Sequence, residues 1–183
     1  MKKIFERLNQ AAHLRNILIL LALQTLLQFI MLGWFLPQLR GPEGTFYTLD
    51  IRFSYSMKEV EEYFIALDAP GRLAYLLNEI IDMVFGLIYL LSFSFIITAL
   101  GRIAFSGKKF WHWFYIIPLA MVTFDYIENF SVITMLVGFP EHLNIALFSS
   151  FFTSLKQIAT SMTIFLIMGM GLAAFKKKLF LTK

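Results

Sequence analysis

Four long apolar stretches alternate with shorter polar segments along this chain of 183 residues. They cover residues 16–36, 78–100, 113–137 and 145–175. Each is at least as long as the roughly 20 apolar residues that a helix needs to cross the hydrocarbon layer of a membrane. The pattern predicts an all-α fold, a polytopic membrane four-helix bundle that forms a single integral membrane domain over residues 1–183.

The largest polar segment, residues 37–71, lies between the first and second predicted spans. Within it, residues 41–44 (GPEG) predict a turn. Ser56 followed three residues later by Glu59 is the pattern of a capping box, which begins a helix. The spacing of the residues after it places three apolar side chains on one helix face: Val60, Phe64 and Leu67. We therefore expect a short extracytoplasmic amphipathic helix on the surface of the bundle.

Charged residues make up only 15% of the chain, and their placement sets the orientation. Basic side chains dominate the N-terminal tail, the 101–112 loop and the C-terminal tail, where Glu6 is the one acid. Acids dominate the other side: Glu43, Asp50, Glu59, Glu61, Glu62, Asp68 and Glu141. Because Lys and Arg concentrate in cytoplasmic loops, we expect a multi-pass protein of the bacterial cytoplasmic (inner) membrane with both termini cytoplasmic. The basic residues flank spans, so no nucleic-acid partner is expected.

Composition also excludes several kinds of site. The chain has no cysteine, which removes thiolate catalysis, Fe–S clusters and cysteine-based zinc sites. His13 and His112 fall on the predicted cytoplasmic side and His142 on the other, so the histidines cannot converge on one metal ion or haem. The acids alone would suit only a hard cation. We expect no metal and no cofactor.

Charged side chains within the spans are the candidate chemistry, because ionisable groups inside a membrane usually face a cavity or a partner. Asp125, Glu128 and Asn129 are spaced so that they share one face of the third span. In the fourth span, Lys156 and Gln157 belong to a polar stripe with threonines on either side. The second span carries Glu79 and Asp82, and the first carries a polar strip of its own: Gln24, Thr25 and Gln28.

The depths of these side chains predict how they meet. Glu128 and Lys156 each lie a few residues from the centre of their span, so we expect an ion pair between them. Asp125 would lie one turn further inward, Asp82 near the outer boundary and Glu79 beside the interface. The acids outnumber the lysine, so either some are protonated or an arginine reaches down from the outer segment: Arg52 or Arg72.

The sequence resembles an uncharacterised family of small four-span bacterial membrane proteins. The specific parts are a D-x-R-F-x-Y block at residues 50–55 and a D-x-x-E-N block at residues 125–129. Further matching positions are Glu59, Val60, Gly71, Arg72, Tyr75, Asp82, Pro140 and Lys156. The resemblance implies the four-span topology and a set of polar residues, and it implies no activity.

Together these patterns predict a protein with an outward-opening polar site inside the membrane that binds a lipid or small amphiphile, or a protein that acts as an accessory subunit. The expected ligand-binding residues are Asp50, Arg52, Tyr55, Arg72, Asp82, Asp125, Glu128, Asn129, Lys156 and Gln157. A second hypothesis is a metal-independent membrane enzyme that acts on a lipid, with Asp82, Asp125 and Glu128 as candidate acids and bases. Proton-coupled transport is a third hypothesis, and a purely structural role is a fourth. A membrane-protein partner or a homo-oligomer is compatible with all of them.

Overall fold

The computed structural model describes residues 2–39, 48–108 and 110–181, and the elements within these residues are all helical. The turn expected at 41–44 lies outside the described residues, as does Glu43. Four helical stretches are long and apolar enough to cross a membrane: Leu14–Gln38, Asp68–Ala104, Phe110–Val137 and Leu143–Leu179. This confirms the all-α class and the expectation of a multi-pass membrane protein.

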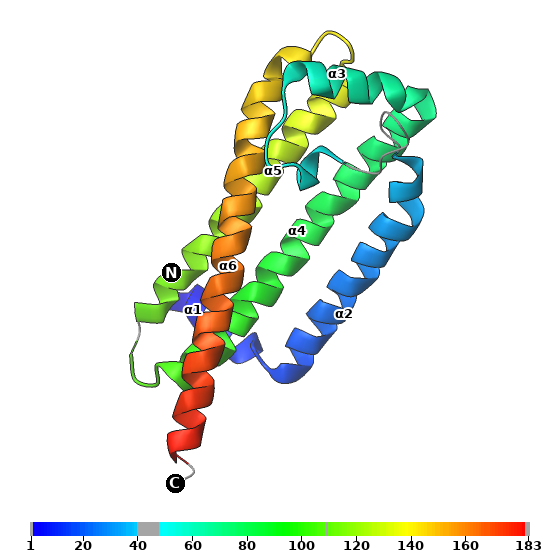
Figure 1. The fold of residues 1–183 in the computed structure, drawn as a ribbon. Coiled ribbons are helices and arrows are strands. Elements are labelled where there is room, and N and C mark those ends of the chain that lie inside the picture. Colours follow the sequence, from blue (N-terminus) through cyan, green and yellow to red (C-terminus); the bar gives the residue numbers. More distant parts are fainter. Residues whose placement is uncertain (1, 40–47, 109, 182–183) are drawn as a thin grey trace.

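The long helices run side by side, and a short helix crosses one end of the bundle (Figure 1). These helices are α2 (Leu14–Ile30), α4 (Asp68–Ala104), α5 (Ile116–Val137) and α6 (Ala146–Leu181), and the crossing helix is α3 (Met57–Ala66). The tail before α2 forms a further helix, α1 (Lys2–Ala11), that the apolar pattern does not predict. Helices α4, α5 and α6 pack against one another, whereas α2 packs mainly along α4.

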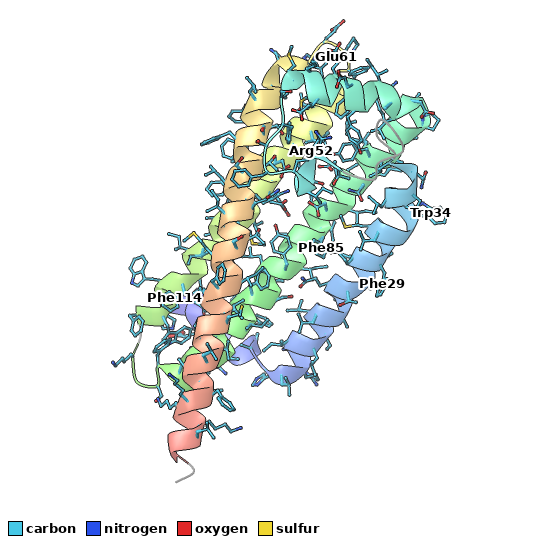
Figure 2. The ribbon with its side chains drawn as sticks, viewed as in Figure 1. Phe29, Trp34, Arg52, Glu61, Phe85 and Phe114 are labelled. Carbon is cyan, nitrogen blue, oxygen red and sulfur yellow. The ribbon has the colours of Figure 1, made fainter. Side chains whose placement is uncertain are left out.

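Helix α2 therefore leaves the bundle open on one side. All of its residues are described, and Ile17 alone among them is buried. The helix continues through a π-helical turn, η1 (Met31–Phe35), into a 3-10 turn, η2 (Leu36–Gln38). Phe29 and Trp34 project away from the other helices (Figure 2), with 71% and 70% of their surface exposed. Such exposure of large apolar side chains suits a surface that faces lipid.

The capping box predicted before α3 is present. Ser56 Oγ accepts a hydrogen bond from the Glu59 N–H at 3.3 Å, and Glu59 Oε2 accepts one from the Ser56 N–H at 2.7 Å. These two bonds satisfy donors that the first turn of a helix leaves free, so α3 begins at Met57.

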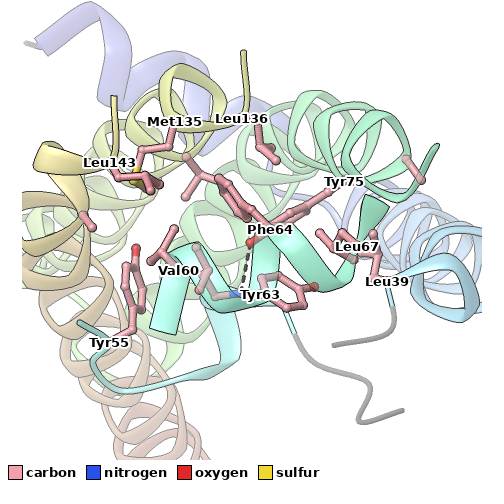
Figure 3. Packing of buried hydrophobic residues seen from close by; sticks show 14 of the residues in the cluster. Leu39, Tyr55, Val60, Tyr63, Phe64, Leu67, Tyr75, Met135, Leu136 and Leu143 are labelled. Carbon is pink, nitrogen blue, oxygen red and sulfur yellow. Dashed lines mark hydrogen bonds between the residues drawn. The ribbon is translucent and has the colours of Figure 1, made fainter. Parts of the chain in front are cut away.

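Helix α3 buries one face in an apolar cluster at the end of the bundle (Figure 3). Val60, Phe64 and Leu67 are buried, as their spacing predicts, and Tyr63 joins them. The rings of Phe64 and Tyr75 meet edge to face with their centroids 6.3 Å apart. The Tyr75 hydroxyl accepts a hydrogen bond at 2.9 Å from the Leu49 N–H, so this cluster also holds the chain that precedes α3.

Helix α4 begins well before the apolar run that predicts it. Its first residue, Asp68, adopts a positive φ of 53°, and its Oδ1 accepts a hydrogen bond from the Gly71 N–H at 2.9 Å. The helix then continues for 37 residues, or about 56 Å. Its first turns are therefore available to carry polar side chains under α3.

A close contact fixes the other end of α4 against the start of α5. Trp111 belongs to the 3-10 turn η5 (Phe110–Tyr115) and is buried. A Cβ placed on Gly101 would lie 2.5 Å from the Trp111 ring. The absence of a side chain at Gly101 is thus what admits the indole.

Candidate functional site

The chain before α3 is tied to α6 by side-chain-to-backbone hydrogen bonds. It contains a 3-10 turn, η4 (Leu49–Ile51), and then runs along α6. Gln157 Nε2 donates to the Asp50 carbonyl at 3.1 Å and also to the Arg52 carbonyl. Ser154 Oγ donates to the Phe53 carbonyl at 2.6 Å. These bonds bring the Asp50 side chain to the middle of α6.

Lys156 lies at the centre of a cluster of acids. Its Nζ is 3.3 Å from Asp125 Oδ1 and 3.7 Å from Asp50 Oδ1, and it forms an ion pair with Glu128 Oε2. The Lys156 side chain is 11% exposed and that of Glu128 is fully buried. The ion pair expected between Glu128 and Lys156 is confirmed.

Other polar side chains hold the acids in place from three helices. Tyr89 on α4 donates its hydroxyl proton to Asp125 Oδ2 at 2.7 Å. Thr153 on α6 donates to Glu128 Oε1 at 2.7 Å. Asn129 Nδ2 on α5 donates to Asp82 Oδ2 on α4 at 2.9 Å. The cluster therefore links α4, α5 and α6.

Helices α4 and α5 approach closely beside the cluster because α4 has a glycine there. A Cβ on Gly86 would lie 3.1 Å from the Tyr126 ring and 3.2 Å from Asp125 Oδ2. Both distances are shorter than ordinary van der Waals contact, so even a methyl group would press on the carboxylate that faces Lys156.

The Tyr55 hydroxyl covers the cluster on the side of α3. It donates to Ser149 Oγ at 2.8 Å and lies 3.1 Å from Thr153 Oγ1. The Tyr55 N–H donates to Ser150 Oγ at 2.8 Å. Burial raises the pKa of the Tyr55 hydroxyl above its ordinary value, and the charge of Glu128 acts in the same direction. The phenol therefore stays protonated and remains a donor.

The two candidate arginines have partners outside the acid cluster. Arg52 Nη1 forms an ion pair with Glu59 Oε1 at 3.2 Å. Arg72 Nη1 donates to the Phe64 carbonyl at 2.7 Å, and its guanidinium carbon lies 5.1 Å from the centroid of the Phe139 ring. The Arg72 side chain is thus held by α3 and the α5–α6 connection.

Glu79 is a further buried acid of α4. Its side chain is fully buried, and neither of its carboxylate oxygens has a hydrogen-bond partner. The ionisable groups that act on it include Asp50, Asp82, Glu128 and Lys156, which makes it a further member of the cluster. Its burial follows from the early start of α4, because α3 and the residues before it cover this part of the helix.

Two cavities adjoin the cluster and share Asp50, Asp82 and Phe85 in their walls. One, of about 280 Å³, extends toward η2 and is lined largely by apolar residues, including Leu32, Leu36 and Leu39. The other, of about 250 Å³, extends along α4 and α6 and is lined by Gln24, Phe85, Tyr89, Phe93, Asp125 and Lys156. Phe85 lies on the side of α4 that faces α2 (Figure 2). Each cavity is therefore lined by both charged and apolar side chains.

Most of the sequence-predicted site residues lie in one cluster. The structure brings together Asp50, Asp82, Asp125, Glu128, Asn129 and Lys156, with Tyr55 and Gln157 as hydrogen-bonding neighbours. Gln24 and Gln28 line the cavities, whereas Thr25 bonds to the Leu21 carbonyl of its own helix. In the part of the chain that the structure describes, no group of three or more acidic or histidine side chains is arranged to hold a metal ion.

Three serines that bind the chain before α3 are absent from the residues that the sequence singles out. Ser149, Ser150 and Ser154 face that chain from α6. A signal for them exists, because their spacing with Thr153 places all four hydroxyls on one side of a helix. A membrane helix with such a hydroxyl face needs a polar partner, which here is the backbone at residues 53–55.

No protein-family model, curated protein or solved structure matches this chain at a significant level. The function must therefore be inferred from the geometry of the site.

Proposed function

We propose that this chain is a multi-pass protein of the bacterial cytoplasmic membrane that binds a lipid or small amphiphile between α2, α4 and α6. Both termini would lie on the cytoplasmic side, and α3 would be an extracytoplasmic amphipathic helix. The excess of Lys and Arg in the two tails and the 101–112 loop supports this orientation. Under it, the cavity toward η2 opens near the outer surface.

The observation that carries the proposal is the pair of adjoining cavities, each lined by both charged and apolar side chains. Ligand pockets are typically apolar spaces with a few polar groups that fix the orientation of the ligand. Here Asp50, Asp82 and Lys156 provide the polar end, and Phe85 and Leu32 belong to the apolar walls. An amphiphile could place its head at the acids and its chain against α2.

The exposure of α2 supports entry from the membrane. This helix packs mainly on α4 and buries little of its own surface. An acyl chain that reaches the cavities from the side would therefore not have to cross a packed helix interface. A pocket that opened only to water would offer an apolar chain no such route.

The test is to identify what co-purifies with the protein by mass spectrometry of an organic extract. Leu32→Trp places an indole at the wall of the cavity toward η2, and Leu26→Trp makes the same change at a similarly exposed residue that lines neither cavity. A double variant, Asp125→Asn/Glu128→Gln, removes charge from the polar end. Monodisperse elution in an uncharged detergent checks that each variant folds.

We expect one class of amphiphile with the wild type and with Leu26→Trp, and a severalfold smaller amount with Leu32→Trp and with the double variant. If no amphiphile is enriched, or if all four proteins carry equal amounts, the cavities do not form a binding site. The cluster would then serve only to pack the helices. Because Leu32→Trp leaves the acids intact, the test does not depend on the folding of the double variant.

A further inference from the structure

Around the acid cluster, the buried side-chain atoms that lack a hydrogen bond are of one kind. Among the described residues there, the buried side-chain atoms without a hydrogen-bond partner are all acceptors: Gln24 Oε1, Asp50 Oδ1, both oxygens of Glu79, and Asn129 Oδ1. Glu128 Oε2 also lacks a hydrogen bond but lies against Lys156 in the ion pair. Unpartnered buried polar atoms are rare in folded proteins, and each requires an explanation.

The donors that Lys156, Asn129 and Gln157 place at the cluster are already used. Lys156 faces Asp125 and Glu128, and its Nζ is 3.7 Å from Asp50 Oδ1, too far for a hydrogen bond. The Asn129 amide donates to Asp82, and Gln157 Nε2 donates to backbone carbonyls. With the carboxyl groups ionised, these three side chains leave Asp50 Oδ1, Asn129 Oδ1 and both oxygens of Glu79 without a donor.

Negative charge is also in excess at the cluster. Asp50, Glu79, Asp82, Asp125 and Glu128 interact with one another and with the single ammonium group of Lys156. Arg52 forms an ion pair with Glu59, and Arg72 donates to the Phe64 carbonyl. An anionic head would add negative charge and further acceptors to this site, whereas a cation would relieve both excesses.

We propose that the site selects an amphiphile whose head carries a primary ammonium group. This inference rests on the proposed function and names its ligand class. An ammonium group brings three N–H donors, no acceptor and one positive charge, which is what the acceptors around Asp50 and Asp82 lack. The aromatic side chains Phe85 and Tyr89 line the same cavity and favour a cation near their rings. The alkyl chain would lie along the apolar walls.

The first experiment compares head groups on one chain length. Native mass spectrometry measures the binding of dodecylamine, dodecyltrimethylammonium, dodecanol and dodecanoate to the wild type in an uncharged detergent near neutral pH. We expect dodecylamine to bind at least about tenfold more tightly than dodecyltrimethylammonium, because the latter has the charge without N–H donors. Dodecanoate should bind weakest.

The second experiment asks where the ammonium group comes from. Phosphatidylethanolamine carries a primary ammonium on a diacyl lipid, and phosphatidylcholine is its counterpart without N–H donors. In nanodiscs that contain both lipids in equal amounts, enrichment of phosphatidylethanolamine around the protein would assign the head to a diacyl lipid. Binding of dodecylamine without that enrichment would assign it to a single-chain amine.

Two variants test whether the preference for an ammonium head depends on the acids. Asp82→Asn removes one charge from both cavities, and Glu61→Gln makes the matched carboxylate-to-amide change on the exposed face of α3. We expect Asp82→Asn to reduce the preference for dodecylamine over dodecyltrimethylammonium severalfold and Glu61→Gln to leave it unchanged. A wild-type preference in a folded Asp82→Asn would overturn the inference.

The outcomes separate the two proposals. If none of the four dodecyl compounds binds, the proposed function fails and this inference fails with it. If all bind alike regardless of the head, or if dodecanoate binds best, the proposed function stands and the ammonium inference is overturned. The head-group series uses the wild type alone, so this separation does not require any variant to fold.

Discussion

Replacing Lys156 by Met should lower the free energy of unfolding more than any single surface substitution does. The substitution keeps an unbranched apolar stem and removes the ammonium group that faces Asp125, Glu128 and Asp50. These acids would then lie together in a buried site without a cation.

The magnitude follows from the distances. At an effective dielectric constant of about 20, opposite charges 3.3 Å apart, such as Lys156 and Asp125, attract by about 5 kcal/mol. Part of this attraction offsets the cost of removing the charges from water, which Lys156→Met no longer incurs for the lysine. Removing one partner of a buried ion pair typically costs about 3–5 kcal/mol, and we expect a value in that range.

The assay is reversible unfolding in mixed detergent micelles, followed by circular dichroism as the fraction of a denaturing detergent rises. Lys58→Met is the matched control, because Lys58 is 83% exposed and pairs with Glu62 at 3.7 Å on the surface of α3. Its cost should be less than about 1 kcal/mol. Adding Glu128→Gln to Lys156→Met should restore about 0.5–3 kcal/mol, since it removes one of the unpaired acids.

Two results would refute this reasoning. The first is a Lys156→Met protein as stable as the Lys58→Met control, which would mean that the lysine does not hold the acids together. The second is a double variant whose loss of stability equals the sum of the two single losses, which would mean that Glu128 and Lys156 do not interact across α5 and α6.

Three further predictions concern the packing around the site, each measured by the same unfolding assay. Gly101→Ala should cost about 1–3 kcal/mol, because the new methyl group would lie 2.5 Å from the indole of η5. The control Gly169→Ala, with nothing within 4 Å of the new methyl group, should be neutral or stabilising by up to about 1 kcal/mol. Equal changes in stability from the two substitutions would contradict the contact at Gly101. Tyr75→Phe should cost about 1–3 kcal/mol, because it leaves the buried Leu49 N–H without an acceptor, and a neutral result would show that another group replaces the hydroxyl. The hydrogen bond from the Ser56 backbone N–H lowers the pKa of Glu59. The stability that this carboxylate contributes is therefore complete above its ordinary pKa of 4.5 and is lost as the pH falls through the lower folded-state value. The difference in unfolding free energy between wild type and Glu59→Gln should shrink in acid, and a constant difference would argue against the cap.

Several features of the fold can be predicted from local sequence alone. The four spans follow from the length of the apolar runs, because a helix must satisfy its own backbone hydrogen bonds inside a membrane. Ser56 and Glu59 mark the start of α3, since a capping box uses only neighbouring residues. Asp125, Glu128 and Asn129 share a face by helical spacing, and the pairing of Glu128 with Lys156 follows once the spans are placed side by side.

Other features have no local signal. The apolar run does not predict that α4 begins at Asp68, because a polar first turn is compatible with both a loop and a helix. The burial of Glu79 depends on α3 and on the chain before it, which fold over α4. The partners of Arg72 depend on the position of Phe139 beyond the end of α5.

The sequence by itself therefore determined the helices, their apolar surfaces and the polar faces that they turn inward, because these depend on periodicity along one segment. Tertiary structure alone decided that Asp50 reaches Lys156 through hydrogen bonds between α6 side chains and the backbone of a distant segment. It also decided that cavities lie beside the acids and that the unpartnered buried side-chain atoms at the acid cluster are acceptors. Such properties arise from the relative placement of segments far apart in the chain, on which periodicity carries no information.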